Sequence, residues 1–309
     1  MQNLPIIIAG PTASGKTDAA LALAKMTGGG VISADSRQVY KLLTAGTAKP
    51  QGIWHEGIYR VEGVPYHLVD FLDINEAFDV SKFCAMAGDI KSNQIIFAGG
   101  TGMYLQGFFA GMDKLPPANK QIRAELQNLA DTNGKAALHE RLAGVDAQSA
   151  AQIPPGNIQR VMRALEIFMI TGKPASLLRT GAKGIQIPPS KARFFYLNWD
   201  KEVLNKRIAL RTQNIFAPMV TEAQKALAAG YSADAPGLKS LCYAEAIAFL
   251  EGKITQEQAI ERITILTRQY AKRQRTWFAR YDDIININLE GRFDAAKVAQ
   301  RILEWKQPQ

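Results

Sequence analysis

The chain has 309 residues, of which 47% are hydrophobic and 21% charged, a composition typical of a globular protein of one large or two medium domains. No apolar run reaches the length of about 18 residues that a membrane span needs, and two cysteines are too few for a disulfide framework, so we expect a cytoplasmic protein. The net charge of +9 indicates a polyanionic partner, while the three dispersed histidines exclude a Cys/His cluster with zinc-site spacing.

The first recognisable feature is a complete phosphate-binding loop, G-x-x-x-x-G-K-[S/T], between an apolar strand at residues 4–9 and an apolar helix at residues 18–25. Its residues are Gly10, Pro11, Thr12, Ala13, Ser14, Gly15, Lys16 and Thr17. Backbone N–H groups in such a turn surround anionic oxygens at a helix N-terminus. Lys16 adds positive charge, and the Thr17 hydroxyl can bind Mg²⁺. We therefore predict that the chain binds a di- or triphosphate.

Further strands are expected at residues 31–33, 94–98, 193–199 and 284–287, which indicates an α/β fold with a P-loop NTPase-like parallel sheet. A helix or loop is expected at residues 103–109. After the Leu115-Pro116-Pro117 breaker the pattern becomes helical, with a second helix at residues 158–170, and residues 204–250 and 255–281 are also helical in pattern. We expect a catalytic core of residues 1–114 and 191–309, with a helical C-terminal part, and an inserted helical domain of residues 115–190.

Two polar residues follow strands of this core. An ATPase usually has an Asp at the end of a strand to hold magnesium, but the 94–98 strand runs into Gly99-Gly100-Thr101-Gly102. Asp35 instead follows the 31–33 strand, and residues at the carboxyl ends of parallel strands face the ligand. Asp35 is thus a candidate proton acceptor or metal ligand, and Thr101 a candidate donor to a phosphate oxygen.

Several segments, in order along nearly the whole chain, resemble the tRNA dimethylallyltransferase (tRNA isopentenyltransferase) family. Besides the phosphate loop, they are residues 33–40 (SADSRQVY), 46–50 (GTAKP), 67–70 (HLVD), 99–105 (GGTGMYL), 163–166 (RALE), 171–174 (TGKP) and 267–278 (TRQYAKRQRTWF). The Asp-Ser-Arg-Gln-Val-Tyr and Ala-Lys-Arg-Gln segments are specific to this family, whereas a phosphate loop alone is not.

The resemblance implies transfer of the dimethylallyl group from dimethylallyl diphosphate to the exocyclic amino group of the adenine 3′ of the anticodon, in tRNAs that read codons beginning with U. It implies Mg²⁺ as cofactor, with Thr17 as a ligand, Asp35 as general base and Thr101 as a catalytic residue at the diphosphate. The residues it assigns to tRNA are Asp35, Ser36, Arg37, Gln38, Thr101, Arg123, Gln159, Arg160, Val161, Met162, Arg163, Lys272, Arg273, Gln274 and Arg275.

RNA binding also has support from charge alone. Residues 262–280 contain basic side chains and no acidic ones, and Ile263, Leu266, Tyr270 and Trp277 recur at the spacing of a buried helix face. The chain departs from the family pattern at Cys242-Tyr243-Ala244, where Gly-Tyr-Lys/Arg is usual, so the RNA contact of that basic residue is lost. It departs again at Asn157-Ile158, where the second position is commonly acidic.

Three alternatives remain at this point: prenyl transfer to free adenine nucleotides, a small-metabolite kinase, and an RNA-binding module with a vestigial phosphate loop. The helical insert and the basic C-terminal segment favour tRNA over free nucleotides. Intact Lys16, Thr17, Asp35 and Thr101 favour an enzyme. With no exposed heptads we expect a monomer.

Overall fold

The chain divides into two compact units, and the computed structural model describes residues 3–179 and 187–305 of it. The first unit comprises Met1–Ala110 and Ile185–Gln309, and the second comprises Gly111–Gly184. The boundaries expected from the sequence, after residues 114 and 190, lie a few residues later in each case. None of the helices in the described ranges is long and apolar enough to cross a membrane.

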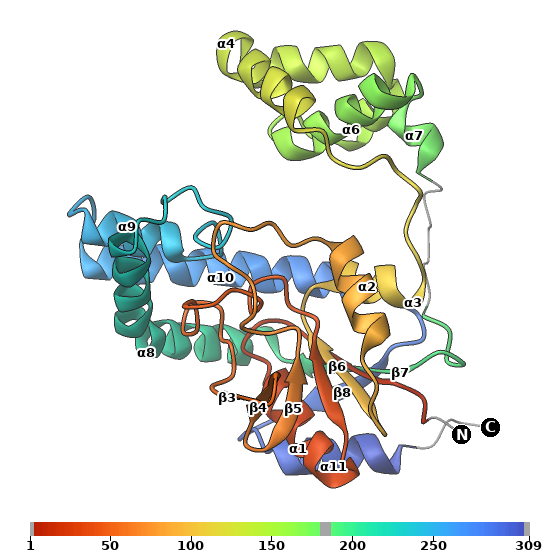
Figure 1. Ribbon diagram of the computed structural model, residues 1–309, viewed down its shortest axis with the longest axis vertical. Helices are drawn as coiled ribbons and strands as arrows, with labels where there is room; N and C mark the ends of the chain where they lie inside the picture. The colour runs from red at the N-terminus through yellow and green to blue at the C-terminus, as the bar shows by residue number, and fades with distance from the viewer. Residues whose placement is uncertain (1–2, 180–186, 306–309) are drawn as a thin grey trace. The chain divides into compact units, whose positions relative to one another are not determined.

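An eight-stranded sheet lies at the centre of the first unit, in the order β3-β4-β5-β2-β6-β1-β7-β8 (Figure 1). The strands are β1 (Ile6–Ala9), β2 (Gly30–Ser33), β3 (Ile53–His55), β4 (Ile58–Val61), β5 (Val64–His67), β6 (Ile95–Gly99), β7 (Arg193–Trp199) and β8 (Ile285–Leu289). Strands β5, β2, β6, β1, β7 and β8 pair in parallel, and β3 and β4 add an antiparallel edge. The expected parallel sheet is confirmed.

Helices cover both faces of this sheet: α1 (Lys16–Thr27) and α11 (Ala295–Glu304) cover one, and α2 (Val80–Asp89), α3 (Gly102–Phe109) and the end of α10 (Gln256–Phe278) cover the other. Helices α8 (Lys201–Ala228) and α9 (Tyr243–Leu250) pack with α10 and with the segment that follows β2. Strand β1 alternates between the two faces: Ile6 and Ile8 pack with α1 and α11, while Ile7 and Ala9 pack with α2, α3 and the end of α10. The central strands are therefore buried on both sides, as parallel strands usually are.

Two parts of the first unit differ from the expectation. Strands β3, β4 and β5 were not predicted because they are short and β3 is fully exposed, so no apolar alternation marks it. The turns between them, Glu56-Gly57 and Glu62-Gly63, have positive φ at all four positions, as two-residue hairpin turns require. The helical pattern expected over residues 204–250 is interrupted in the structure. Residues 229–242, which contain Gly230, Pro236 and Gly237, separate α8 from α9.

All the regular secondary structure in the described part of the second unit is helical. It contains α4 (Lys120–Val145), α5 (Ala147–Gln152), α6 (Ile158–Thr171) and α7 (Ala175–Leu178). Its core includes Leu126, Leu138 and Leu142 of α4 and Leu165 of α6. Helix α4 is interrupted at Gly134, whose φ of 85° and ψ of 164° are not helical. The expected helical insert is thus present as a compact body of its own.

Candidate active site

The phosphate loop connects β1 to α1, at the carboxyl edge of the parallel strands. Gly15, the residue before α1, has φ of 92°, and a Cβ there would lie 2.4 Å from the ring of Phe293. Only glycine therefore fits this position. No side chain in the described part of the chain caps the N-terminus of α1. Its first backbone N–H groups and the positive end of the helix dipole are available to an anion.

Helix α10 holds the loop through Gln274, which is buried. Its side-chain oxygen accepts from the Thr12 N–H at 2.8 Å, and its side-chain nitrogen donates to the Gly100 carbonyl at 3.1 Å. The amide of Gln274 thus connects the phosphate loop to the segment after β6. Both ends of the amide thus bond to backbone, and the expected tRNA contact of Gln274 stays a prediction.

Helix α8 and strand β7 hold the other side of the loop. The Trp199 indole N–H donates to the Ser14 carbonyl at 3.0 Å, and the Arg207 Nε donates to the Ala13 carbonyl at 2.9 Å. The Arg207 guanidinium also lies 4.6 Å from the centroid of the Trp199 ring and 5.6 Å from that of Phe293. These contacts fix the loop before any ligand is present, which reduces the ordering cost of binding one.

Two cationic side chains, Lys16 and Arg211, lie at the loop, and the negative charge near them does not offset the effect of burial on their pKa values. The Lys16 Nζ donates to the Pro11 carbonyl at 2.8 Å, and an Arg211 N–H donates to the Thr12 hydroxyl at 3.0 Å. Burial lowers the pKa of Lys16 to about 8, against the opposing influence of Asp35. Burial likewise lowers the pKa of Arg211. A bound polyanion would supply the missing charge for both groups.

Asp35 and Thr101 lie at the ends of neighbouring strands, as expected. The Asp35 carboxylate accepts from the Arg37 N–H at 2.9 Å, and the Thr101 hydroxyl accepts from the Ser36 N–H at 3.1 Å. Tyr270 of α10 lies near Thr101, and burial raises the pKa of its phenol. Thr101 therefore anchors the segment that carries Asp35, and its contact with a phosphate oxygen stays a prediction.

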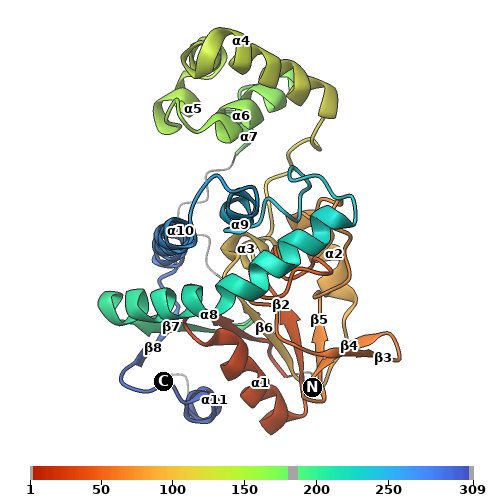
Figure 2. The ribbon, with the colours of Figure 1, turned by 90° about the vertical axis from the view of Figure 1, so that its left-hand side faces the viewer.

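A cavity of about 970 Å³ lies within the first unit, and both the phosphate loop and Asp35 line it, whereas Thr101 is not among its lining residues. Helices α8, α9 and α10 gather at this end of the sheet (Figure 2). Its lining includes residues 12–18, residues 35–38, residues 46–48, Arg207, Arg211, Cys242, Tyr270, Arg273 and Gln274. The sequence-predicted phosphate loop and Asp35 thus face the same space. Arg207 and Arg211 were missed, although two arginines four residues apart share one face of a helix.

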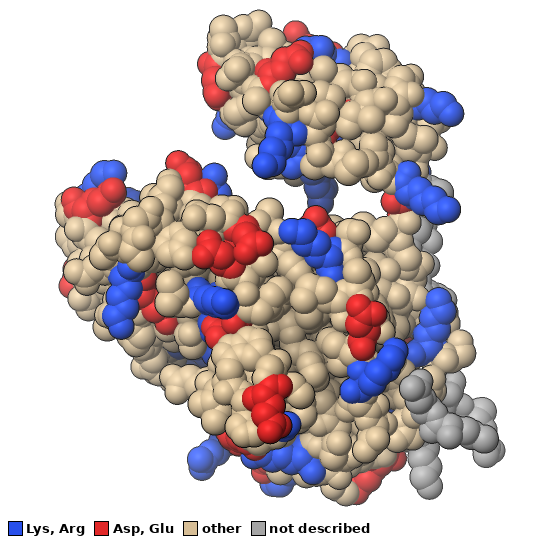
Figure 3. Space-filling model, viewed as in Figure 1, with Lys and Arg blue, Asp and Glu red and all other residues tan. Residues whose placement is uncertain are grey.

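The remaining predicted RNA contacts of the first unit lie on α10. Lys272 and Arg273 are exposed and Arg275 is half-buried. The buried face of this helix is formed by Ala259, Ile263, Ala271, Gln274 and Phe278. Of the four residues expected on that face only Ile263 is buried. On the face drawn in Figure 3, Lys and Arg are dispersed among Asp and Glu. The excess of basic over acidic side chains noted above is a property of residues 262–280, most of which belong to α10.

Gln38 lies beside Asp35 and also lines the cavity. Its side-chain nitrogen donates to the Ala48 carbonyl at 2.8 Å, and its side-chain oxygen accepts from the Ser33 hydroxyl at 2.8 Å. The residue is buried. Both ends of its amide thus bond within the protein, and its expected contact with tRNA stays a prediction.

The residues of the second unit that were predicted to contact tRNA differ in their exposure to solvent. Gln159 and Arg160 are exposed on α6, whereas Val161 and Met162 are buried in the core, so their side chains cannot reach RNA. Arg123 and Arg163 both bind the fully buried Glu166, through an Nε–Oε1 contact of 2.9 Å and an NH1–Oε2 contact of 2.5 Å. Arg163 also donates to the Pro116 carbonyl at 2.6 Å. Arg123 and Arg163 thus stabilise this unit internally.

A match to the protein family described as IPP transferase extends over residues 38–281. The tRNA dimethylallyltransferase of Elusimicrobium minutum (strain Pei191) is 53% identical and aligns with 98% of this chain and 100% of its own length. That of Myxococcus xanthus (strain DK1622) is 41% identical, over 88% of each chain.

Solved structures agree with these relatives. The tRNA isopentenylpyrophosphate transferase of Bacillus halodurans is 31% identical and superposes with a TM-score of 0.64, covering 97% of this chain and 94% of its own. A eukaryotic dimethylallyltransferase acting on tRNA is 25% identical with a TM-score of 0.68, covering 96% of this chain and 75% of its own. The similarity therefore includes both units of the chain.

Proposed function

This chain belongs to the IPP transferase family of tRNA dimethylallyltransferases, and we propose how its residues transfer a dimethylallyl group to tRNA. The observation that carries the proposal is the single cavity shared by the phosphate loop and Asp35. In the reaction, the bond between the allylic carbon and the diphosphate oxygen breaks and its electron pair leaves with the diphosphate. A bond forms from the same carbon to the exocyclic nitrogen of adenine, and that nitrogen loses a proton.

The phosphate loop would bind the leaving diphosphate. Its N–H groups, Lys16 and Arg211 all face the cavity, and burial weakens the proton affinity of both cations. Negative charge grows on the diphosphate as the allylic bond breaks, so these groups would stabilise the transition state more than the bound substrate. Thr101 would donate a hydrogen bond to an oxygen of the same diphosphate.

Asp35 would accept the proton of the adenine amino group. An aromatic amine is a poor nucleophile until this proton is shared with a base, and a carboxylate in the cavity wall is suited to the task. The adenine must leave the stacked anticodon loop to reach Asp35. Ser36 and Arg37, which line the same cavity, would hold the extruded base.

Magnesium would bind at the diphosphate through the Thr17 hydroxyl. Among the described residues, no group of three or more His, Cys, Asp or Glu side chains could hold a metal ion, so phosphate and water oxygens would supply the other ligands, as Mg²⁺ commonly accepts. The hydroxyl is a hard oxygen donor that fits this ion. The bound ion would neutralise part of the leaving-group charge.

The tRNA backbone would contact the exposed basic side chains of α10 and α6, chiefly Lys272, Arg273 and Arg160. The adenine 3′ of the anticodon as acceptor, tRNAs that read codons beginning with U, a cytoplasmic location and a monomeric state remain predictions.

The proposal is tested with labelled dimethylallyl diphosphate, Mg²⁺ and an anticodon stem-loop that has adenine at the 3′ neighbour of the anticodon. The control stem-loop has guanine there, which lacks the 6-amino group, and AMP is the free-nucleotide control. We expect label only in the adenine stem-loop. Label in the guanine stem-loop or in AMP, or no transfer at all, would contradict the proposal.

A further inference from the structure

The loop of residues 44–48, called here the wall loop, forms part of the cavity lining. Its residues Gly46, Thr47 and Ala48 line the cavity together with residues 35–38. Both segments belong to the connection between β2 and β3, and Gln38 joins them through its bonds to the Ala48 carbonyl and the Ser33 hydroxyl. The wall loop is thus connected to the strand end that carries Asp35.

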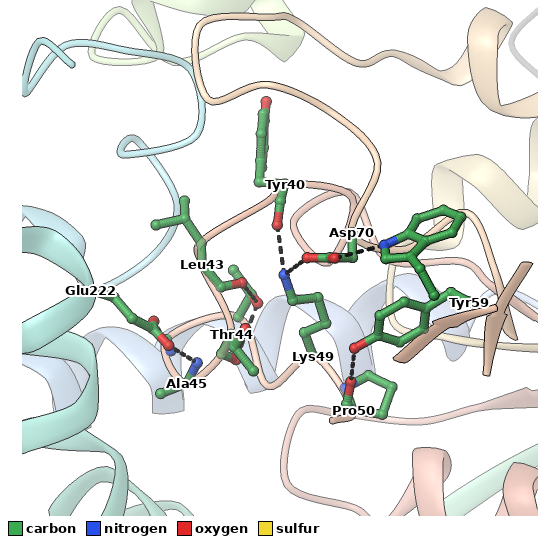
Figure 4. A network of polar contacts seen from close by, with 12 residues as sticks. Tyr40, Leu43, Thr44, Ala45, Lys49, Pro50, Tyr59, Asp70 and Glu222 are labelled. Carbon is green, nitrogen blue, oxygen red and sulfur yellow. Dashed lines mark hydrogen bonds and ion pairs between the residues drawn. The ribbon is translucent and has the colours of Figure 1, made fainter. Parts of the chain in front are cut away.

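A carboxylate from α8 holds the opposite side of the wall loop. Glu222 Oε1 accepts from the Ala45 N–H at 2.7 Å, and Oε2 lies 3.5 Å from the Gly46 nitrogen (Figure 4). Oε2 also accepts from the Tyr243 hydroxyl at 2.6 Å. Hydrogen bonds to an ionised carboxylate are stronger than neutral ones, so this side chain is a firm anchor for two backbone groups.

Tyr243 completes the anchor from α9. The side chain is fully buried, and burial together with Glu222 raises the pKa of its phenol, so the hydroxyl remains a donor at neutral pH. Its ring packs so closely on the wall loop that a Cβ at Gly46 would lie 2.5 Å from it. Tyr243 therefore sets the position of the loop by contact as well as through Glu222.

The end of the wall loop is fixed independently. The buried Lys49 ammonium donates to the Tyr40 carbonyl at 2.8 Å and pairs with Asp70 (Figure 4). Asp70 also accepts from the Trp54 indole N–H at 3.0 Å. Because the loop is already held at this end, loss of the Glu222 contact should shift its cavity-lining part and leave the rest of the fold intact.

We propose that Glu222 and Tyr243 are positioning residues for the acceptor base, which act by holding the wall loop against the Asp35 end of the cavity. The inference rests on the proposed function. The wall loop and the Asp35 segment both line the cavity, while the groups proposed to bind the diphosphate belong to the phosphate loop and to Arg211 of α8. A displaced wall loop should therefore weaken use of tRNA and leave donor binding unchanged.

The test compares Tyr243→Phe and Glu222→Gln with Tyr231→Phe. Tyr231 is a matched control because its hydroxyl also donates to a carboxylate, that of Asp73 at 2.7 Å, and this bond does not involve the wall loop. For each variant we would measure kcat and KM for the stem-loop, inorganic diphosphate binding by calorimetry, and Tm. For Tyr243→Phe and Glu222→Gln we expect the stem-loop KM to rise about tenfold, the size expected for loss of a charge-assisted hydrogen bond, with diphosphate affinity unchanged. Tyr231→Phe should change neither.

Three outcomes would overturn the inference: wild-type KM for the stem-loop in both variants, equal loss of diphosphate and stem-loop affinity, or unfolding of both while Tyr231→Phe stays folded. Each would assign the contacts to the fold alone. If wild-type protein transfers no label to the stem-loop, it is the proposed function that fails. Normal transfer by wild-type protein with unaffected variants rejects only the roles of Glu222 and Tyr243.

Discussion

Replacing Gln274 with leucine should release the phosphate loop from α10. Leucine matches glutamine closely in size but can bond neither to the Thr12 N–H nor to the Gly100 carbonyl, which the glutamine contacts at 2.8 and 3.1 Å. Each lost hydrogen bond should cost about 1 kcal/mol, and the buried carbonyl left without a partner somewhat more. We therefore expect the free energy of unfolding to fall by about 2 kcal/mol and diphosphate to bind about tenfold more weakly.

Urea unfolding and calorimetric titration with inorganic diphosphate and Mg²⁺ measure these two effects. Gln269→Leu is the matched control, because Gln269 is exposed on the same helix and the substitution is identical. It should leave both quantities near the wild-type values. Unchanged diphosphate binding by Gln274→Leu would refute the reasoning, and weaker binding of tRNA alone would instead support the predicted contact of Gln274 with tRNA.

Burial lowers the pKa of Lys16 to about 8, so its ammonium loses its charge and diphosphate affinity should fall as pH rises through that value; calorimetry should find this additional loss in wild type but not in Lys16→Met. Arg163→Met should lower the free energy of unfolding by about 2 kcal/mol because it removes one of the two arginine partners of the buried Glu166, whereas the exposed Arg160→Met should change stability little; equal effects in urea unfolding would contradict this. Lys272→Gln should flatten the slope of log tRNA affinity against log salt by about 0.7, and a wild-type slope would show that Lys272 touches no phosphate.

The features that local sequence determines were predicted well. The phosphate loop is recognisable because its glycines and Lys16-Thr17 are close in sequence, and the 193–199 strand is marked by the aromatic and apolar run of residues 194–197. Strands β3, β4 and β5 have no such apolar run. Their Glu-Gly turns were the available signal, since glycine in the second turn position favours the positive φ observed there.

Contacts between distant segments were not predictable in the same way. Arg207, Arg211 and Glu222 lie some 200 residues from the loops they hold, and only the packing of α8 brings them there. The same limit explains Gln274, Val161 and Met162, since a motif shows that residues belong together but not which side chains face inward. Tyr270 illustrates this: its helical spacing suggested the core, yet it lines the cavity.

The central claim is that Asp35 accepts the proton in a site whose diphosphate is held by other residues. Single-turnover transfer to the adenine stem-loop by Asp35→Ala, at saturating donor and tRNA, tests it most directly. The predicted result is a rate lower by about 10²- to 10⁴-fold, the usual cost of losing a general base, with donor and stem-loop affinities close to wild type. A wild-type single-turnover rate would contradict the claim, because it would mean that Asp35 does not take part in the chemical step.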